Sequence, residues 1–475
     1  MRNMSKIKYW ICFLCSLLGT FETMSQIRLP GLFSDGMVLQ QNSLVAIRGW
    51  GEASEELQII PGWNLKDTLR VKVDNQGCWK ADLITTEAGG PYTLEIKGRK
   101  DSRTFSDVML GEVWLCSGQS NMEWSADMGI MNGEEEVKQA SCPSLRIYHV
   151  PKYGADAPQT DCRAVWEVAS PESMRRTSAT AYFFARYLTE HLEVPVGIIV
   201  SAWGGTPAEV WTPAEIVLED EVLSKNKLTE YPWWPVKPGV LYNQMIHPLA
   251  PYRIAGCIWY QGESNHENAD SYARLLSKMI GAWRSDFGWN FPFYYVQIAP
   301  HTYGAVNNTP ALLREQQQYL LSQVDNTAMI NISDLVEDVK DIHPRNKRAI
   351  GERLACLAMD KVYGQFTQAY ESPRMSFLEY RKGNIIIHFD GKFSKLEWKN
   401  SEMKGLVIKN YRGDSLKVNV KIRGKCLVVP VKENERPFQV SYCFDEATVG
   451  SLRTEVGLPI LPFNAKVDLI YPSLK

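Results

Sequence analysis

GEVWLCSGQSNMEW, residues Gly111–Trp124, joins an apolar run to a cluster of small polar side chains. The apolar half is typical of a strand that is buried on both faces of a sheet. The polar half, Ser117–Asn121, follows the end of that strand. In parallel α/β sheets, ligands bind beyond these strand ends. The stretch therefore indicates either a plain turn out of the core or a turn that presents a reactive hydroxyl.

Strand and helix patterns alternate along the middle of the chain. The apolar strands are expected at 108–116, 196–201, 254–260, 293–298 and 327–332, and the helices at 177–192, 270–287, 310–323 and 346–362. Alternation of this kind, with continuously apolar strands, predicts a doubly wound α/β fold in which helices cover both faces of a parallel sheet.

Short strands separated by turn residues flank this region on both sides. They are expected at 44–49, 69–73 and 92–96 before it, and at 384–389, 405–408 and 426–431 after it. Such spacing indicates small β-domains. We therefore expect a signal segment at 1–25, an N-terminal β-sandwich domain at 26–107, a central α/β domain at 108–365 and a C-terminal β-domain at 366–475.

The first 25 residues have the pattern of an export signal. Arg2, Lys6 and Lys8 precede a short apolar core over 9–18, and small residues stand at 23 and 25. This core is too short to span a bilayer, and no later apolar stretch is long enough. We expect an exported protein, periplasmic or secreted, that is not held in a membrane after the signal is removed.

Composition narrows the choice of partners. The net charge is −2, from 52 basic and 54 acidic residues, so no basic excess favours nucleic acid. The histidines lack metal-ligand spacing, and we expect neither a metal nor an organic cofactor. The cysteines are scattered, which leaves open a Cys142–Cys162 disulfide or buried free thiols.

Four polar clusters fall at the predicted ends of strands or before the last helix. They lie at 117–121, 203–206, 261–265 and 341–344. Together they hold a hydroxyl, an imidazole, a carboxylate and amide or main-chain donors, which are the groups that acyl transfer requires. His343 could take the proton of the Ser120 hydroxyl. The N–H groups of Ser120 and Gly205 and the side-chain amide of Asn265 could then stabilise the oxyanion.

Ser120 also has a simpler interpretation. Residues 120–123, Ser-Asn-Met-Glu, match a capping box at the start of a helix, which needs no catalytic role. The co-occurrence of the other three clusters favours the catalytic interpretation.

Several long motifs resemble the sialate O-acetylesterase family within the SGNH, or GDSL-like, hydrolases. They are GEVWLCSGQSNMEW (111–124), WGGTPAEVW (203–211), IWYQGESN (258–265), LREQQ (313–317) and DIHPRNKRAIGERLA (341–355), with LPGLFSDGMVLQQ (29–41) and GGPYTLEIKG (89–98) before them. The resemblance runs from about residue 29 to 360. It implies a flavodoxin-like SGNH hydrolase core and a serine esterase that removes O-acetyl groups from carbohydrates, first of all acetylated sialic acid.

The resemblance also implies residue roles. Ser120 is the expected nucleophile, His343 the base, and Gly205 and Asn265 complete the oxyanion hole with the main chain of Ser120. The wider superfamily often carries its acid three residues before the histidine, where this chain has Lys340.

Three aspartates remain as partners for the histidine. Asp341, two residues before it, is the expected orienting acid, and Asp338 and Asp334 are the alternatives.

The expected substrate contacts are Gln119, Gln261, Glu263, Arg314 and Trp203. Arg314 could meet a sugar carboxylate or form a surface ion pair, and Trp203 could be a sugar platform or core packing. Two other functions stay open: deacetylation of a plant polysaccharide such as xylan, and non-catalytic carbohydrate binding.

Overall fold

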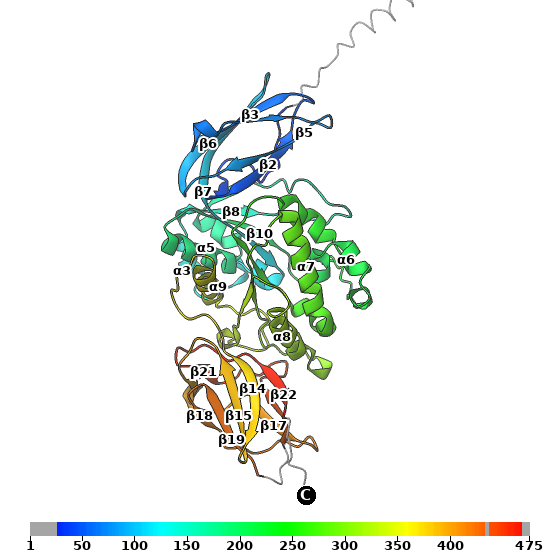
Figure 1. The fold of residues 1–475 in the computed structure, drawn as a ribbon, viewed down its shortest axis with the longest axis vertical. Coiled ribbons are helices and arrows are strands. Elements are labelled where there is room, and N and C mark those ends of the chain that lie inside the picture. Colours follow the sequence, from blue (N-terminus) through cyan, green and yellow to red (C-terminus); the bar gives the residue numbers. More distant parts are fainter. Residues whose placement is uncertain (1–25, 433–436, 468–475) are drawn as a thin grey trace, which may run out of the picture.

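The computed structural model describes residues 26–432 and 437–467. The N-terminal strands, a central sheet with its helices, and the C-terminal strands follow one another along the long axis (Figure 1). The expected export signal at 1–25 lies outside the described residues.

The central sheet has the strand order β13-β12-β11-β7-β10-β8-β9. Its strands are β7 (Ser102–Gly118), β8 (Cys142–His149), β9 (Trp166–Ala169), β10 (Val196–Ala202), β11 (Gly256–Tyr260), β12 (Phe293–Val296) and β13 (Thr327–Ile330). All neighbours are parallel except β9, which is antiparallel to β8. The strands β10-β7-β11-β12-β13 have the order 2-1-3-4-5 in the chain, as in flavodoxin-like sheets. The expected α/β fold is confirmed, and its sheet is mixed, because the edge strand β9 is antiparallel.

The burial pattern of strand β7 changes along its 17 residues. Buried and exposed residues alternate near its start, where it pairs with β6 (Gly89–Lys97). From Leu110 to Gly118 every residue is buried, because β10 and β11 flank this half inside a covered sheet. The division expected at 107 falls within this strand, which runs unbroken from the N-terminal strands into the central sheet.

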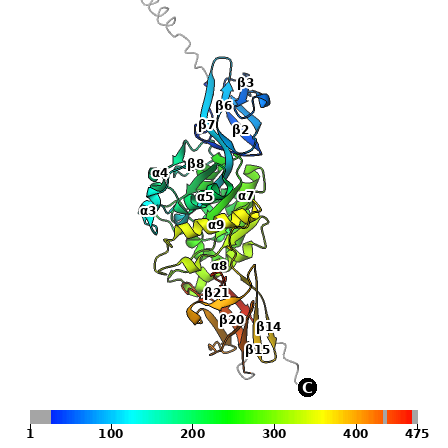
Figure 2. The same cartoon turned by 90° about the vertical axis from the view of Figure 1, so that its left-hand side faces the viewer.

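Helices cover both faces of the sheet, as expected. On one face, α5 (Ala179–Leu192) and α9 (Lys347–Lys361) share a hydrophobic core with the strands (Figure 2). On the other face, α7 (Tyr272–Phe287) and α8 (Thr309–Leu320) belong to a second core. The side chain of Asn346 caps α9 by accepting a hydrogen bond from the main chain of Ala349. This cap fixes the helix start a few residues after the 341–344 cluster.

The remaining elements are short. The N-terminal strands are β1 (Val38–Gln40), β2 (Leu44–Trp50), β3 (Glu56–Pro61), β4 (Leu69–Lys72) and β5 (Cys78–Ile84). The C-terminal strands are β14 (Arg374–Arg381), β15 (Asn384–Asp390), β16 (Leu396–Trp398), β17 (Leu406–Asn410), β18 (Lys421–Arg423), β19 (Cys426–Pro430), β20 (Pro437–Tyr442), β21 (Leu452–Thr454) and β22 (Phe463–Lys466). These C-terminal strands enclose a hydrophobic core of their own. Short helices are α2 (Ser120–Glu123), α3 (Gly133–Lys138), α4 (Pro171–Arg176) and α6 (Ala214–Leu218).

The cysteines of the described residues are free thiols, so Cys142 and Cys162 do not form the disulfide that was one of the two expectations. Within the same ranges, no helix combines the length and the apolar character that crossing a membrane requires.

Candidate active site

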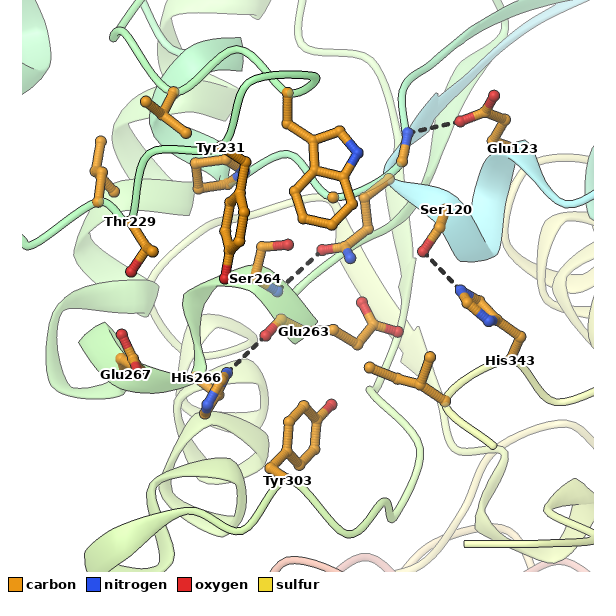
Figure 3. A pocket seen from close by; sticks show the side chains of 18 of the residues that line it. Ser120, Glu123, Thr229, Tyr231, Glu263, Ser264, His266, Glu267, Tyr303 and His343 are labelled. Carbon is orange, nitrogen blue, oxygen red and sulfur yellow. Dashed lines mark hydrogen bonds between the residues drawn. The ribbon is translucent and has the colours of Figure 1, made fainter. Parts of the chain in front are cut away.

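Ser120 and His343 meet at the carboxyl ends of the central strands. Ser120 is the first residue of α2, directly after β7, and His343 lies in the loop before α9. The Ser120 Oγ and the His343 Nε2 are 3.0 Å apart (Figure 3). Gly118 makes the sharp exit from β7 possible, because a Cβ there would lie 2.2 Å from the carbonyl oxygen of Tyr260. The hydroxyl is thus held where an imidazole can accept its proton.

Two side chains, Asp341 and Trp124, lie beside the His343 ring. The Asp341 Oδ1 lies 3.8 Å from the His343 Nδ1, which is too long for a hydrogen bond, and accepts one of 2.9 Å from the main-chain N–H of His343. The indole of Trp124 stacks on the imidazole face, with ring centroids 3.8 Å apart and an interplanar angle of 19°. Ser120 therefore contacts the edge of the ring and Trp124 its face.

The alternative acids do not reach the histidine. Asp334 is paired with Arg353 through bonds of 2.8 and 2.9 Å, and Asp338 accepts a hydrogen bond from the main chain of Lys340. Asp341 is the carboxylate beside His343.

Burial shifts the pKa values of three ionisable groups in and behind the site: His343, Lys347 and Glu263. The pKa of His343 is lowered to about 4, chiefly by burial and also by the charge of Lys347, while Asp341 opposes the shift. Burial also lowers the pKa of Lys347 to about 7 and raises that of Glu263. Asn121 links the two, because it accepts from the Lys347 Nζ at 2.5 Å and donates to the Glu263 Oε1 at 2.6 Å. His343 is consequently neutral at neutral pH, the form in which it accepts a proton.

The main chains of Ser120, Gly204 and Gly205 lie at the pocket. The N–H groups of Ser120 and Gly205 have no hydrogen-bond partner within the described residues. The neighbouring N–H of Gly204 donates to the Glu123 Oε2 at 2.6 Å, which ties the turn after β10 to α2. Gly205 has a φ of 73°, a left-handed conformation that favours glycine. The Ser120 and Gly205 N–H groups are free to bind a developing negative charge.

Asn265 and Gln261 lie behind the pocket rather than in it. The Asn265 Oδ1 accepts from the main chain of Ala208 at 2.9 Å and from the Gln261 Nε2 at 2.7 Å. The Asn265 Nδ2 donates to the Glu209 Oε2 at 2.8 Å. Both amides are buried and satisfied within the protein, and neither lines the pocket. The expected oxyanion role of Asn265 and substrate contact of Gln261 are therefore wrong for this structure.

Arg314 and Trp203 also lie outside the pocket. The guanidinium of Arg314 is buried and donates to the main-chain carbonyls of Cys443, Asp445 and Glu446. Burying its charge there requires those acceptors, so the expected contact with a sugar carboxylate is wrong. Trp203 is half-buried and packs against the hydrophobic core. Its expected role as a platform in the pocket is wrong as well.

The pocket above Ser120 has a volume of about 480 Å³. Gln119 and Glu263, two of the five expected substrate contacts, line it. The Gln119 Oε1 accepts from the main chains of Gly262 and Ser264, at 3.3 and 3.2 Å, and its Nε2 has no partner within the described residues. Across the described chain, no group of three or more His, Cys, Asp or Glu side chains is arranged to hold a metal ion.

Sequence reasoning named none of the aromatic side chains that form the walls of this pocket as substrate contacts. They come from Trp124, Tyr231, Trp234 and Tyr303. Trp124 ends the opening motif, and Trp234 belongs to a Trp pair in a long loop. The sequence shows where Trp124 and Trp234 stand in the chain. It does not show that they lie near Ser120, because that depends on the conformations of the loops.

Comparisons with known proteins show the family of the chain. The model of a family described as "carbohydrate esterase, sialic acid-specific acetylesterase" matches residues 110–360. Human sialate O-acetylesterase is 30% identical over 383 residues, 73% of each chain, and the rat enzyme is 28% identical over 76% of this chain and 78% of its own. The crystal structure of a carbohydrate acetylesterase from Xanthomonas citri superposes with a TM-score of 0.83 at 32% identity, covering 92% of this chain and 99% of the other. The chain belongs to the sialate O-acetylesterase family and is a carboxylic ester hydrolase.

Proposed function

We propose that this enzyme removes O-acetyl groups from carbohydrates, with Ser120 as the nucleophile and His343 as the general base. The observation that carries the proposal is the 3.0 Å contact between the Ser120 Oγ and the His343 Nε2 in a pocket large enough for a sugar. The relatives named as acetylesterases support the choice of the acetyl ester.

The reaction has two steps. The Ser120 Oγ attacks the acetyl carbonyl carbon as His343 takes the hydroxyl proton. The C–O bond to the sugar then breaks, and the sugar oxygen receives that proton from His343. In the second step water gives a proton to His343, and its oxygen attacks the carbonyl carbon of the acetyl-serine. The bond from that carbon to the Ser120 Oγ then breaks, His343 returns the proton to Ser120, and acetic acid is released and ionises to acetate.

Three donors are proposed for the oxyanion. Two are the main-chain N–H groups of Ser120 and Gly205, which lack other partners. We assign the third to the Gln119 Nε2 in place of Asn265, since Gln119 lines the pocket and its Oε1 is already fixed by two main-chain N–H groups. Asp341 is assigned as the residue that orients His343 through the main chain.

Acetylated sialic acid is the first candidate substrate, because the family is named for it. Among the described residues that line the pocket, Lys227 is the one Lys or Arg side chain, and it could meet a sialate carboxylate. Arg314 gives that choice no support. Acetylated xylan or a similar neutral polysaccharide is the second candidate, since the apolar walls do not require a charged sugar.

The test is acetate release from O-acetylated sialic acid, acetylated xylan and a chromogenic acetyl ester. Ser120→Ala should abolish release from all three. Ser285→Ala, at an exposed serine of α7, is the matched control and should leave the rates unchanged. Hydrolysis by Ser120→Ala at the wild-type rate would disprove the nucleophile. Inactivity of the wild type on every ester would favour a carbohydrate-binding protein instead.

We also infer export, from the charged and apolar pattern of residues 1–25. The 2-1-3-4-5 strand order and the site at the strand ends support an SGNH-type catalytic domain, and the separate C-terminal core supports a distinct β-domain after it.

A further inference from the structure

Three aromatic side chains stand together on a tight turn beside the pocket. The turn runs from Tyr231 to Trp234, where the Trp234 N–H donates to the Tyr231 carbonyl at 3.4 Å, and Pro232 occupies the second position that such turns favour. The ring centroids are 4.8 Å apart for Tyr231 and Trp234, 5.9 Å for Trp233 and Trp234, and 6.1 Å for Tyr231 and Trp233. We call residues 231–234 the aromatic turn.

The aromatic turn borders the catalytic pocket. Tyr231 and Trp234 line the same pocket as Ser120 and His343, and Figure 3 shows Tyr231 on the side away from His343. Trp234 lies directly on the main chain of Gly205, because a Cβ at Gly205 would be 2.2 Å from the indole ring. A ligand that touches this turn therefore lies beside the proposed oxyanion site.

The outer part of the turn is left open to water. Trp233 is 63% exposed and Tyr231 44% exposed. A cluster of exposed aromatic rings at the edge of a pocket indicates a binding surface. In water these rings lack the stabilisation that burial of their apolar surface would provide. Trp233 itself is not part of the pocket wall, so its ring extends the aromatic surface beyond the space that one sugar at Ser120 would fill.

The geometry points to a second sugar-binding subsite on the aromatic turn. We propose that Trp233 and Tyr231 stack against the C–H face of the pyranose next to the acetylated unit, while Trp234 contacts the acetylated unit itself. A pyranose is suited to this surface, because one face presents C–H groups and the rim presents hydroxyls to water. The inference rests on the proposed function, and it assigns an acetylated oligosaccharide, rather than a free monosaccharide, as the preferred substrate.

Binding tests this subsite without relying on turnover. The Ser120→Ala enzyme is titrated calorimetrically with two ladders of one to three units, acetylated xylooligosaccharides and O-acetylated sialosides. In at least one ladder, affinity should rise from one unit to two. Adding Trp233→Ala to the Ser120→Ala enzyme should reduce that rise about fivefold. Trp233→Phe should retain most of it. Tyr319→Ala, at a 52% exposed aromatic residue of α8, is the control and should change nothing.

Two results would overturn the subsite. One is an affinity that is flat from one unit to three in both ladders. The other is a rise that persists in full when Trp233 is replaced by alanine. Hydrolysis of the same ladders by the wild type tests the proposed function separately, because binding and acetate release are measured on different enzymes.

Discussion

Replacing Asp341 tests whether this residue is a weak electrostatic partner of His343 or a full member of a catalytic triad. The Asp341 carboxylate is 3.8 Å from the His343 Nδ1, and its side chain is 48% exposed. It makes its hydrogen bond to the main-chain N–H of His343 instead of to the ring. Asp341→Asn keeps an oxygen for that main-chain bond and removes only the charge.

The magnitude follows from these distances. Two unit charges about 4 Å apart in water interact by about 1 kcal/mol, and the exposure of Asp341 places it near this limit. Losing that stabilisation of the imidazolium should lower kcat about fivefold. Asp341→Ala also removes the main-chain bond, worth about 1 kcal/mol more, so it should lower kcat roughly thirtyfold.

The assay is steady-state hydrolysis of a chromogenic acetyl ester by the wild type and both variants, with acetate release from an acetylated sugar as a second readout. Unfolding curves of the three proteins control for loss of fold. In a triad whose carboxylate bonds to the ring, the Asn variant loses about 10⁴ in kcat. A loss of that size for Asp341→Asn would refute the reasoning from the 3.8 Å separation.

Four further outcomes are expected. Because the pKa of His343 is lowered to about 4, kcat/KM should rise with pH through about 4 and be level at neutral pH, and a midpoint near 6.5 in the pH profile would contradict this. Lys347→Met removes a charge that lowers the pKa of His343, so the same midpoint should move to higher pH. Gln119→Glu keeps the acceptor oxygen and loses the donor, and kcat should fall about 10²–10³-fold with the fold intact by circular dichroism. Asn265→Ala removes the donor to the Oε2 of the buried Glu209, whose Oε1 still accepts from Asn226, so denaturant unfolding should show a loss of about 2–3 kcal/mol.

Much of the fold could be predicted because it depends on periodicity. The expected strand 196–201 and helix 346–362 correspond to β10 and α9 within one or two residues at each end. The two strands that were missed, β8 and β9, form the edge of the sheet. β9 is only 4 residues long and partly exposed, so it lacks the continuous apolar run that identified the central strands.

For the site, the sequence predicted the positions of some residues but not the directions in which other side chains point. Ser120 and His343 were placed together because both stand at ends of elements that a parallel sheet gathers at one edge. The role of Asn265 failed because sequence position cannot distinguish a side chain that faces the pocket from one that faces backward. Its amide is held by Glu209 and Gln261, and a buried carboxylate such as Glu209 requires such a donor. Arg314 is buried as well, and for the same reason its guanidinium donates to main-chain carbonyls at and near Cys443.

Four residues of the opening motif each connect a different segment of the chain to the turn that carries Ser120. Gln119 accepts hydrogen bonds from the loop after β11, and Glu123 accepts one from the turn after β10. Asn121 reaches the buried lysine that begins α9, and Trp124 stacks on the imidazole that Ser120 contacts. Polar side chains suit this position, since Gln119, Asn121 and Glu123 each bond to a main chain that passes close to the strand end. Ser120 is therefore positioned by neighbours of which only Gln119 is proposed to take part in the chemistry. A turn holding only a serine would lack the contacts that bring the imidazole and the free N–H groups to it.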